Sequence, residues 1–254
     1  KVAEGLAASD QRFSLMHGSF ANIFSYATAI DGGGVQGILA DLGVSSPQID
    51  SAARGFSFLN DGPLDMRMDP TSGVSAAQWL SLVSLAELAQ VLKDFGEERF
   101  AKRIARAIIE EREKAPLVST LQLAKIVSEA NPAWEKHKHP ATRVFQAIRI
   151  KINSELSDLS CFLEGAAKSL AGGGRLVVIS FHSLEDRLVK RFMRDMARGD
   201  APPPGVPVFE KDIVRNFRMQ TKAIKPSDEE VSRNARSRSA VMRVLEKVAN
   251  DKSQ

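Results

Sequence analysis

Apolar residues recur every three or four positions through the middle of this 254-residue chain. This spacing is typical of helices that bury one face. The runs cover residues 85–95, 100–108 and 141–170. Ser84 and Ser119 have the residue type and position of helix N-caps, while Gly96 and Gly172–Gly174 are placed to end helices. The pattern therefore predicts a block of helices, the last continuous over residues 141–170.

Strand patterns lie on both sides of this helical block. Residues 12–17 alternate apolar and polar positions, which predicts a strand. Two short apolar runs, 35–41 and 175–180, have the pattern of fully buried parallel strands, and 239–247 predicts a closing strand. Residues 198–239, rich in Pro, Gly, Arg and Ser, predict a long mobile excursion that follows a helix beginning near Ser183.

Strands and helices that alternate around a helical block predict an α/β fold with an inserted all-helical domain. We expect the first part of the α/β core over residues 1–61, the helical insertion over 62–140 and the second part of the core over 141–254. Residues 1–8 have the character of a helix end.

Polar, small residues follow three of the predicted strands: HGSF at 17–20, DLGVSSPQ at 41–48 and SFHS at 180–183. In open α/β sheets, ligands bind beyond the carboxyl ends of the strands. The layout of DLGVSSPQ is similar to the acidic, proline-containing motif of amino-methyltransferases. A cytosine amino group is a poor nucleophile, so acceptors that hold its N–H groups would aim it at a sulfonium methyl. The octapeptide alone fits a structural turn at least as well.

Composition narrows the functional classes. The net charge is +4 and the pI about 9.2, with basic residues gathered near the C-terminus. Such a cluster can bind phosphates or be a solvated loop, and composition favours neither. The single cysteine, Cys161, excludes an intrachain disulfide and indicates a reducing compartment, so a cytoplasmic protein is expected. We expect no membrane span, no metal site, no hydrolase triad and no P-loop.

Six stretches together resemble the MraW (RsmH) family, and the resemblance covers nearly the whole chain. They are DLGVSSPQ at 41–48, RGFSF at 54–58, DGPLDMRMDP at 61–70, GEERFAKRIARAI at 96–108, HPATRVFQAIRI at 139–150 with NSEL at 153–156, and ISFHSLEDRLVKRFM at 179–193. The resemblance implies a Rossmann-like methyltransferase core with an inserted helical domain. It also implies S-adenosylmethionine as cofactor and N4-methylation of a decoding-site cytidine in 16S rRNA of the small ribosomal subunit.

By this resemblance, Phe20 packs near the adenosyl group, while Asp41 and Gln48 contact the cofactor. From their positions we infer further roles, with Asp41 also in the catalytic set beside Asn153 and His182. The residues expected to bind the RNA substrate are Ser45, Ser46, Arg149, Arg233, Arg236 and Arg238. A homodimer is left open.

The family begins with a strand, a Gly-Gly-His loop around the methionine part of the cofactor, and a second strand that ends in an acid. None of these precedes Lys1, so we expect the natural protein to carry them upstream, with both strands lying between the strands at Phe13 and Leu39. Two alternatives stay open: a non-catalytic ribosome-binding module, and a DNA amino-methyltransferase, which only the layout of residues 41–47 supports.

Overall fold

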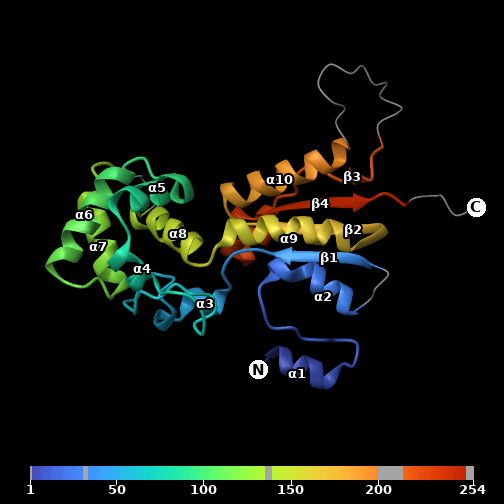
Figure 1. Ribbon diagram of the computed structural model, residues 1–254, viewed down its shortest axis with the longest axis horizontal. Coiled ribbons are helices and arrows are strands. Elements are labelled where there is room, and N and C mark those ends of the chain that lie inside the picture. The colour runs from blue at the N-terminus through green and yellow to red at the C-terminus, as the bar shows by residue number, and fades with distance from the viewer. Residues whose placement is uncertain (1, 31–33, 135–138, 200–213, 250–254) are drawn as a thin grey trace, which may run out of the picture. The chain divides into compact units, whose positions relative to one another are not determined.

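The computed structural model describes residues 2–30, 34–134, 139–199 and 214–249, and these form two compact units (Figure 1). The core unit comprises Lys1–Leu42 and Leu156–Gln254, and the helical unit comprises Gly43–Glu155. The sequence predicts domain boundaries after residues 61 and 140, and these boundaries stay predictions. One part of the predicted excursion, residues 200–213, lies outside the described part of the chain. No helix of the described residues is long and apolar enough to cross a membrane.

The core unit contains a four-stranded sheet in the order β1-β2-β4-β3. Its strands are β1 (Val35–Asp41), β2 (Leu170–Ser180), β3 (Phe217–Met219) and β4 (Val241–Lys247). β1 and β2 are parallel, and β4 is antiparallel to both β2 and β3. The helices of this unit are α1 (Val2–Ser9), α2 (Ile23–Ile30), α9 (Glu155–Ser169), α10 (Ser183–Arg198) and α11 (Asp228–Arg233). The predicted α/β class is confirmed.

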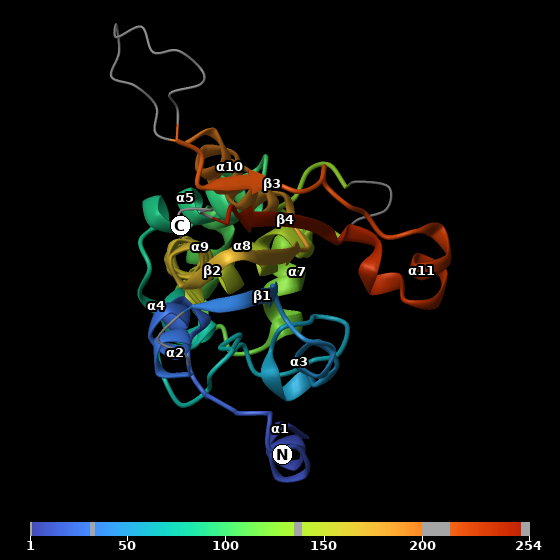
Figure 2. The same cartoon turned by 90° about the vertical axis from the view of Figure 1, so that its right-hand side faces the viewer.

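One face of this sheet carries the core. Ile38, Leu176 and Leu245 are in register across β1, β2 and β4, and all three are buried. They pack in one cluster with apolar residues of α9 and α10, and Figure 2 shows α2 and α9 on the same side of the sheet. The opposite face is less covered, since Leu39 is 68% exposed and Val177 only half-buried. The prediction that both strands are fully buried is therefore wrong.

Three predicted elements differ in the structure. Residues 12–17 form no strand, because no neighbouring segment of the described chain pairs with them. The predicted helix over 141–170 is two helices, α8 (Ala141–Ile152) and α9, separated where Ser154 adopts a φ of 52°. Gly172–Gly174 do not end a helix, since α9 ends at Ser169 and these glycines lie within β2.

Ion pairs join the later elements of the core unit. Arg243 on β4 donates two hydrogen bonds to the Asp186 carboxylate on α10, at 2.7 and 3.0 Å. The buried Glu246 carboxylate accepts from Arg175 of β2 and Arg218 of β3, and these guanidiniums hold its pKa below the ordinary value, Arg175 having the larger effect. Residues 214–239 are not featureless, because they include β3, α11 and a 3-10 helix at Ala235–Ser239.

The described residues of the helical unit bury an apolar cluster between its helices. These are α3 (Ser46–Asp50), α4 (Ala76–Leu82), α5 (Leu85–Gly96), α6 (Ala101–Lys114), α7 (Thr120–Ala130) and α8. The Ser84 and Ser119 side chains accept from the backbone N–H groups of Glu87 and Gln122, so both predicted N-caps are confirmed. Ile104 and Ile108, predicted on one face of α6, are fully buried.

A long ordered loop joins α3 to α4 and contains a short 3-10 helix, Ala52–Arg54. Gly55 has a φ of +71°, and a Cβ there would lie 2.3 Å from the Pro63 carbonyl oxygen. At Gly62 a Cβ would lie 1.9 Å from the Ala52 carbonyl oxygen. The two halves of the loop therefore approach backbone to backbone, which only glycine permits at these positions.

Candidate functional site

β1 and β2 end together, and we call this end of the sheet the carboxyl edge, defined by Asp41 and Ser180. Asp41 pairs in register with Ile179, and the next backbone N–H, of Leu42, donates to the Ile179 carbonyl. The Asp41 side chain is exposed, whereas Ser180 is fully buried with no hydrogen-bond partner for its hydroxyl among the described residues. An exposed carboxylate therefore stands at the place where open α/β sheets bind ligands.

A short 3-10 helix, Phe20–Asn22, directly precedes α2 and brings Phe20 to the same edge. Helix α9 turns directly into β2 at Leu170, so its first half, with Asp158 and Phe162, lies along the later residues of β2 (Figure 1). Ser19 Oγ donates to the Asp158 carboxylate at 2.6 Å, and the Phe20 and Phe162 ring centroids are 5.3 Å apart. Phe20 is still 38% exposed. Its ring thus offers an apolar surface at the edge that carries Asp41.

His182 begins α10 directly beyond β2. Its Nδ1 accepts from the backbone N–H of Glu185, and the Glu185 carboxylate accepts from the backbone N–H groups of Phe181 and His182. His182 Nε2 lies 3.2 Å from Glu185 Oε1. The helix predicted to begin near Ser183 does begin at that residue, and His182 is its N-cap. The imidazole is held at the carboxyl edge by the turn that starts the helix.

Ser45, Ser46 and Gln48 lie in the helical unit, at the start of α3. The Gln48 side-chain oxygen accepts from both the backbone N–H and the hydroxyl of Ser45, at 2.8 and 3.0 Å. Both serines are exposed and Gln48 is half-buried. The local sequence folds this way because Pro47 suits the first turn of a helix, where its missing N–H costs nothing.

Arg149 and Asn153 make their described contacts within the helical unit. Arg149 forms a two-pronged ion pair with the buried Glu155, at 2.7 and 2.8 Å. Asn153 donates to the Met66 carbonyl at 2.7 Å and accepts from the Met68 N–H at 2.6 Å. Asn153 thus holds the end of α8 to the loop that carries the DGPLDMRMDP sequence, whereas Arg149 joins α8 to Glu155 at the start of α9.

Sequence reasoning did not single out the residues that shape this loop. Arg54 donates to the Arg67 and Met68 carbonyls at 2.8 and 2.9 Å. The Arg67 guanidinium beside Asp65 holds the pKa of that carboxyl below its ordinary value. The sequence did contain a signal for these contacts, because the Asp and Arg residues of a turn-rich stretch can pair with one another.

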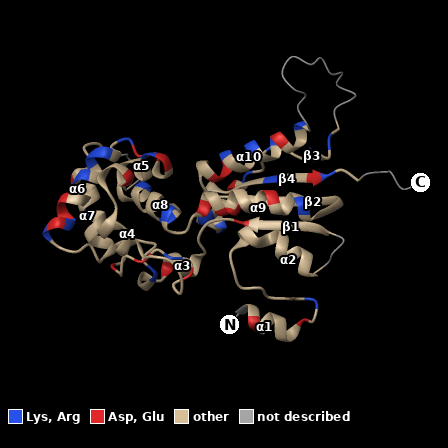
Figure 3. Cartoon of the chain, in the orientation of Figure 1, with Lys and Arg blue, Asp and Glu red and all other residues tan. Residues whose placement is uncertain are grey.

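The three C-terminal arginines predicted to bind RNA are exposed in the core unit. Arg233 ends α11 and pairs with Glu229 at 3.3 Å, while Arg236 and Arg238 lie in the 3-10 helix that follows. Elsewhere basic and acidic residues are mixed along a helix, as Figure 3 shows for α6 and α10. The three arginines follow one another closely in the chain, directly after the acidic first turn of α11.

The expected site residues thus fall into two groups. Phe20, Asp41 and His182 belong to the core unit and lie toward its carboxyl edge. Ser45, Ser46, Gln48, Arg149 and Asn153 belong to the helical unit, in two places: the start of α3 and the end of α8. Their assigned roles stay predictions.

Comparison with known proteins identifies the family. The family model described as "MraW methylase family" matches residues 1–248. The Ribosomal RNA small subunit methyltransferase H of Marinomonas sp. (strain MWYL1) is 57% identical over 246 residues, which are 96% of this chain and 79% of that protein. The protein of the same name from Legionella pneumophila (strain Paris) is 56% identical over 241 residues, 94% of this chain and 78% of that protein. That from Chromohalobacter salexigens is 56% identical over 249 residues, 97% and 75% of the two chains. The resemblance seen in the motifs is confirmed, and the chain belongs to the MraW methylase family.

Proposed function

We propose that this protein transfers a methyl group from S-adenosylmethionine to the exocyclic N4 of a decoding-site cytidine in 16S rRNA of the small ribosomal subunit. The observation that carries the proposal is the 56–57% identity, over nearly the whole chain, to proteins named Ribosomal RNA small subunit methyltransferase H. These names favour the enzyme over a non-catalytic ribosome-binding module and over a DNA methyltransferase. The cytoplasm, where ribosomal subunits are assembled, is then the expected compartment.

The carboxyl edge suits this cofactor chemically. The exposed Phe20 ring can pack against an adenine, because aromatic faces stack favourably. The exposed Asp41 carboxylate can accept hydrogen bonds from the cofactor. S-adenosylmethionine supplies an electrophilic methyl group on a sulfonium centre. Phe20 and Asp41 would hold the cofactor, and we assign Gln48 of the helical unit to the same task.

The protein's own part in the reaction is to position the amino group and to accept its hydrogen bonds. The amino lone pair of cytosine is delocalised into the ring, so acceptors on the N–H groups make the nitrogen a better nucleophile. We assign this to Asp41, Asn153 and His182. Ser45, Ser46 and Arg149 would contact the cytidine, and Arg233, Arg236 and Arg238 the phosphates of the RNA.

The decisive experiment uses S-adenosylmethionine labelled in the methyl group and small ribosomal subunits that lack the modification. We expect label in 16S rRNA, recovered after nuclease digestion as N4-methylcytidine. Subunits that already carry the modification are the control and should take up none. Label on protein, on DNA alone, or on another position of the cytosine ring would contradict the proposal.

A further inference from the structure

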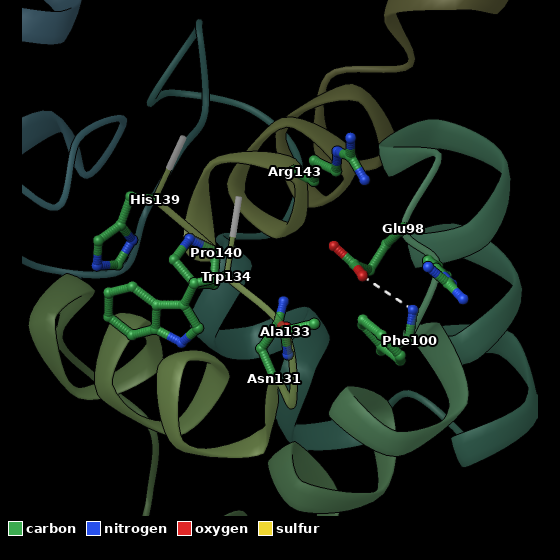
Figure 4. A pocket seen from close by; sticks show the side chains of 9 residues that line it. Glu98, Phe100, Asn131, Ala133, Trp134, His139, Pro140 and Arg143 are labelled. Carbon is green, nitrogen blue, oxygen red and sulfur yellow. Dashed lines mark hydrogen bonds between the residues drawn. The ribbon is translucent and has the colours of Figure 1, made fainter. Parts of the chain in front are cut away.

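The helical unit contains a cavity of about 180 Å³ that none of the assigned roles uses. Three segments form it: the turn between α5 and α6, the chain after α7 and the start of α8 (Figure 4). Glu98, Arg99 and Phe100 come from the first, Asn131, Ala133 and Trp134 from the second, and His139, Pro140 and Arg143 from the third. The cavity is smaller than the roughly 300–1,000 Å³ typical of pockets for drug-sized ligands, so it suits a single small ring system.

An exposed aromatic platform stands at this cavity. Trp134 is 61% exposed, although tryptophan is usually well buried. Its ring meets the His139 ring edge-to-face, with centroids 5.5 Å apart, and His139 in turn stacks against Phe58 at 4.7 Å. The indole therefore packs against the His139 ring, while much of its surface stays open to solvent. Proteins use such aromatic surfaces to stack unpaired nucleic-acid bases.

A buried carboxylate gives the cavity a hydrogen-bond acceptor. Glu98 is only 5% exposed, and it accepts a hydrogen bond from the Phe100 N–H at 2.9 Å. Figure 4 shows its carboxylate directed into the space between Arg143, Pro140 and Phe100. A carboxylate has about four acceptor positions, so this backbone contact leaves capacity for a ligand's N–H groups.

The charged side chains around the carboxylate indicate that the ligand also carries negative charge. Arg99 and Arg143 line the cavity with Glu98, so the walls carry one more positive than negative charge. Arg99 also lies over the Phe100 ring, 5.5 Å from its centroid. A ligand that offers N–H donors to the carboxylate and negative charge to the guanidiniums matches all of these walls. An acidic peptide would bring its carboxylates against Glu98 and fits less well.

We propose that this cavity binds one unstacked guanine in a single-stranded part of the RNA substrate. The guanine face lies on Trp134, its N1–H and N2–H groups donate to Glu98, and the neighbouring phosphates lie near Arg99 and Arg143. Guanine is chosen because it is the base that presents two adjacent N–H donors on its pairing edge. This inference rests on the proposed function for its RNA partner, and it adds a contact to a second base besides the reacting cytidine.

The binding test uses the whole protein and two fluorescein-labelled pentanucleotides, UUGUU and UUUUU. Fluorescence anisotropy should show UUGUU binding about tenfold more tightly, and UUGUU should quench tryptophan emission. Trp134→Phe should abolish that quenching, because Trp79, the only other tryptophan, belongs to the packed core. The preference for UUGUU should remain, because phenylalanine still offers an aromatic face to the base. Replacing guanosine by inosine, which lacks the N2 amino group, should reduce the preference.

Glu98→Gln is the sharpest variant. Glutamine can still accept from the Phe100 N–H through its oxygen, but it turns an N–H₂ group toward the guanine donors. We expect the preference for UUGUU to fall to about twofold or less, with folding intact by circular dichroism. Lys102→Ala, an exposed change on α6, is the matched control and should leave the preference unchanged. Equal binding of both oligonucleotides by the wild-type protein, or an unaltered preference in Glu98→Gln, would overturn the proposal.

Methyl transfer separates this inference from the proposed function. In Trp134→Ala we expect the KM for small subunits to rise several-fold while kcat changes little. If the wild-type protein methylates no ribosomal RNA but still prefers UUGUU, the proposed function fails and the guanine site stands. If it methylates the subunits without any guanine preference, only the guanine site fails.

Discussion

The Asn153 side chain grips the backbone of the loop at Met66, donating to its carbonyl at 2.7 Å while accepting from the Met68 N–H at 2.6 Å. Met66 is completely buried and has a φ of 62°, which is uncommon for a residue with a side chain. One amide thus holds a strained turn against the end of α8. Any catalytic part that Asn153 plays is built on this structural contact.

Asn153→Ala should destabilise the helical unit by about 1–3 kcal/mol, because it leaves two backbone groups of the loop without partners. Urea unfolding measures the loss, and limited proteolysis should show faster cleavage between residues 54 and 70. Gln90→Ala, on the exposed surface of α5, is the control, expected to stay within about 0.5 kcal/mol of the wild type. Unchanged stability and unchanged cleavage in Asn153→Ala would show that the amide contacts contribute nothing.

Arg243→Met should lower the free energy of unfolding by about 2 kcal/mol, since Asp186 loses a two-pronged partner. The loss should stay under the roughly 3–5 kcal/mol typical of fully buried pairs, because the Asp186 side chain is one-quarter exposed. A double-mutant cycle with Asp186→Asn isolates the coupling. Arg194→Met, which breaks the exposed pair with Asp195, provides the comparison and should cost well under 1 kcal/mol. Additive single changes would mean that the pair has no net interaction.

The ion pairs of Glu246 should make the folded protein less stable in acid. Its neighbouring guanidiniums, Arg175 first, lower its pKa below the ordinary 4.5, so the folded state favours the ionised form. The resulting stabilisation is fully present above pH 4.5 and disappears as the pH falls through the lowered pKa. Urea unfolding at several pH values should show a stability gap between wild type and Glu246→Gln at pH 7 that narrows below pH 4.5. The exposed Glu129→Gln is the control, and a gap independent of pH would refute the linkage.

Asp41→Asn tests the carboxyl edge. If the carboxylate accepts a hydrogen bond from the cofactor or the amino group, losing its charge should cost about 1.5–3 kcal/mol, the range for hydrogen bonds to charged groups. Calorimetric titration of S-adenosylmethionine and single-turnover methyl transfer divide the cost between binding and reaction. Asp94→Asn, on α5 of the helical unit, should match the wild type in both assays. Wild-type values for Asp41→Asn would remove this residue from the site.

The arginines at the C-terminus should act through salt-dependent binding. Changing Arg233, Arg236 and Arg238 to alanine should weaken binding to small ribosomal subunits and flatten its dependence on log salt concentration. The slope should fall by up to about 0.7–0.9 for each phosphate that an arginine no longer neutralises. Because all three side chains are exposed, folding and cofactor affinity should not change.

The matched control for these arginines is the triple change of the exposed Lys93, Lys114 and Lys125 to alanine, which removes the same charge from the helical unit. Its slope should stay closer to that of the wild type. If the arginine variant and the wild type show the same affinity and the same dependence on log salt concentration, these arginines do not contact the RNA.

Local interactions determined much of this protein from the sequence alone. Ser84 and Ser119 cap α5 and α7 as predicted, because a cap needs only its own next three residues. The apolar face of α6 and the strand ending at Asp41 also follow from short-range periodicity. The family could be identified because its long motifs are specific, and with it came the expected place of Phe20 and Asp41.

Tertiary structure decided what depends on a partner elsewhere in the chain. Residues 12–17 alternate like a strand but have no neighbouring strand among the described residues to complete their hydrogen bonds. The apolar run of β2 is half-exposed on one face, because α9 and α10 cover only the other. Asn153 and Trp134 acquired their surroundings from segments many residues away. Periodicity reports which side of an element is apolar, whereas only the packed chain determines what that side meets.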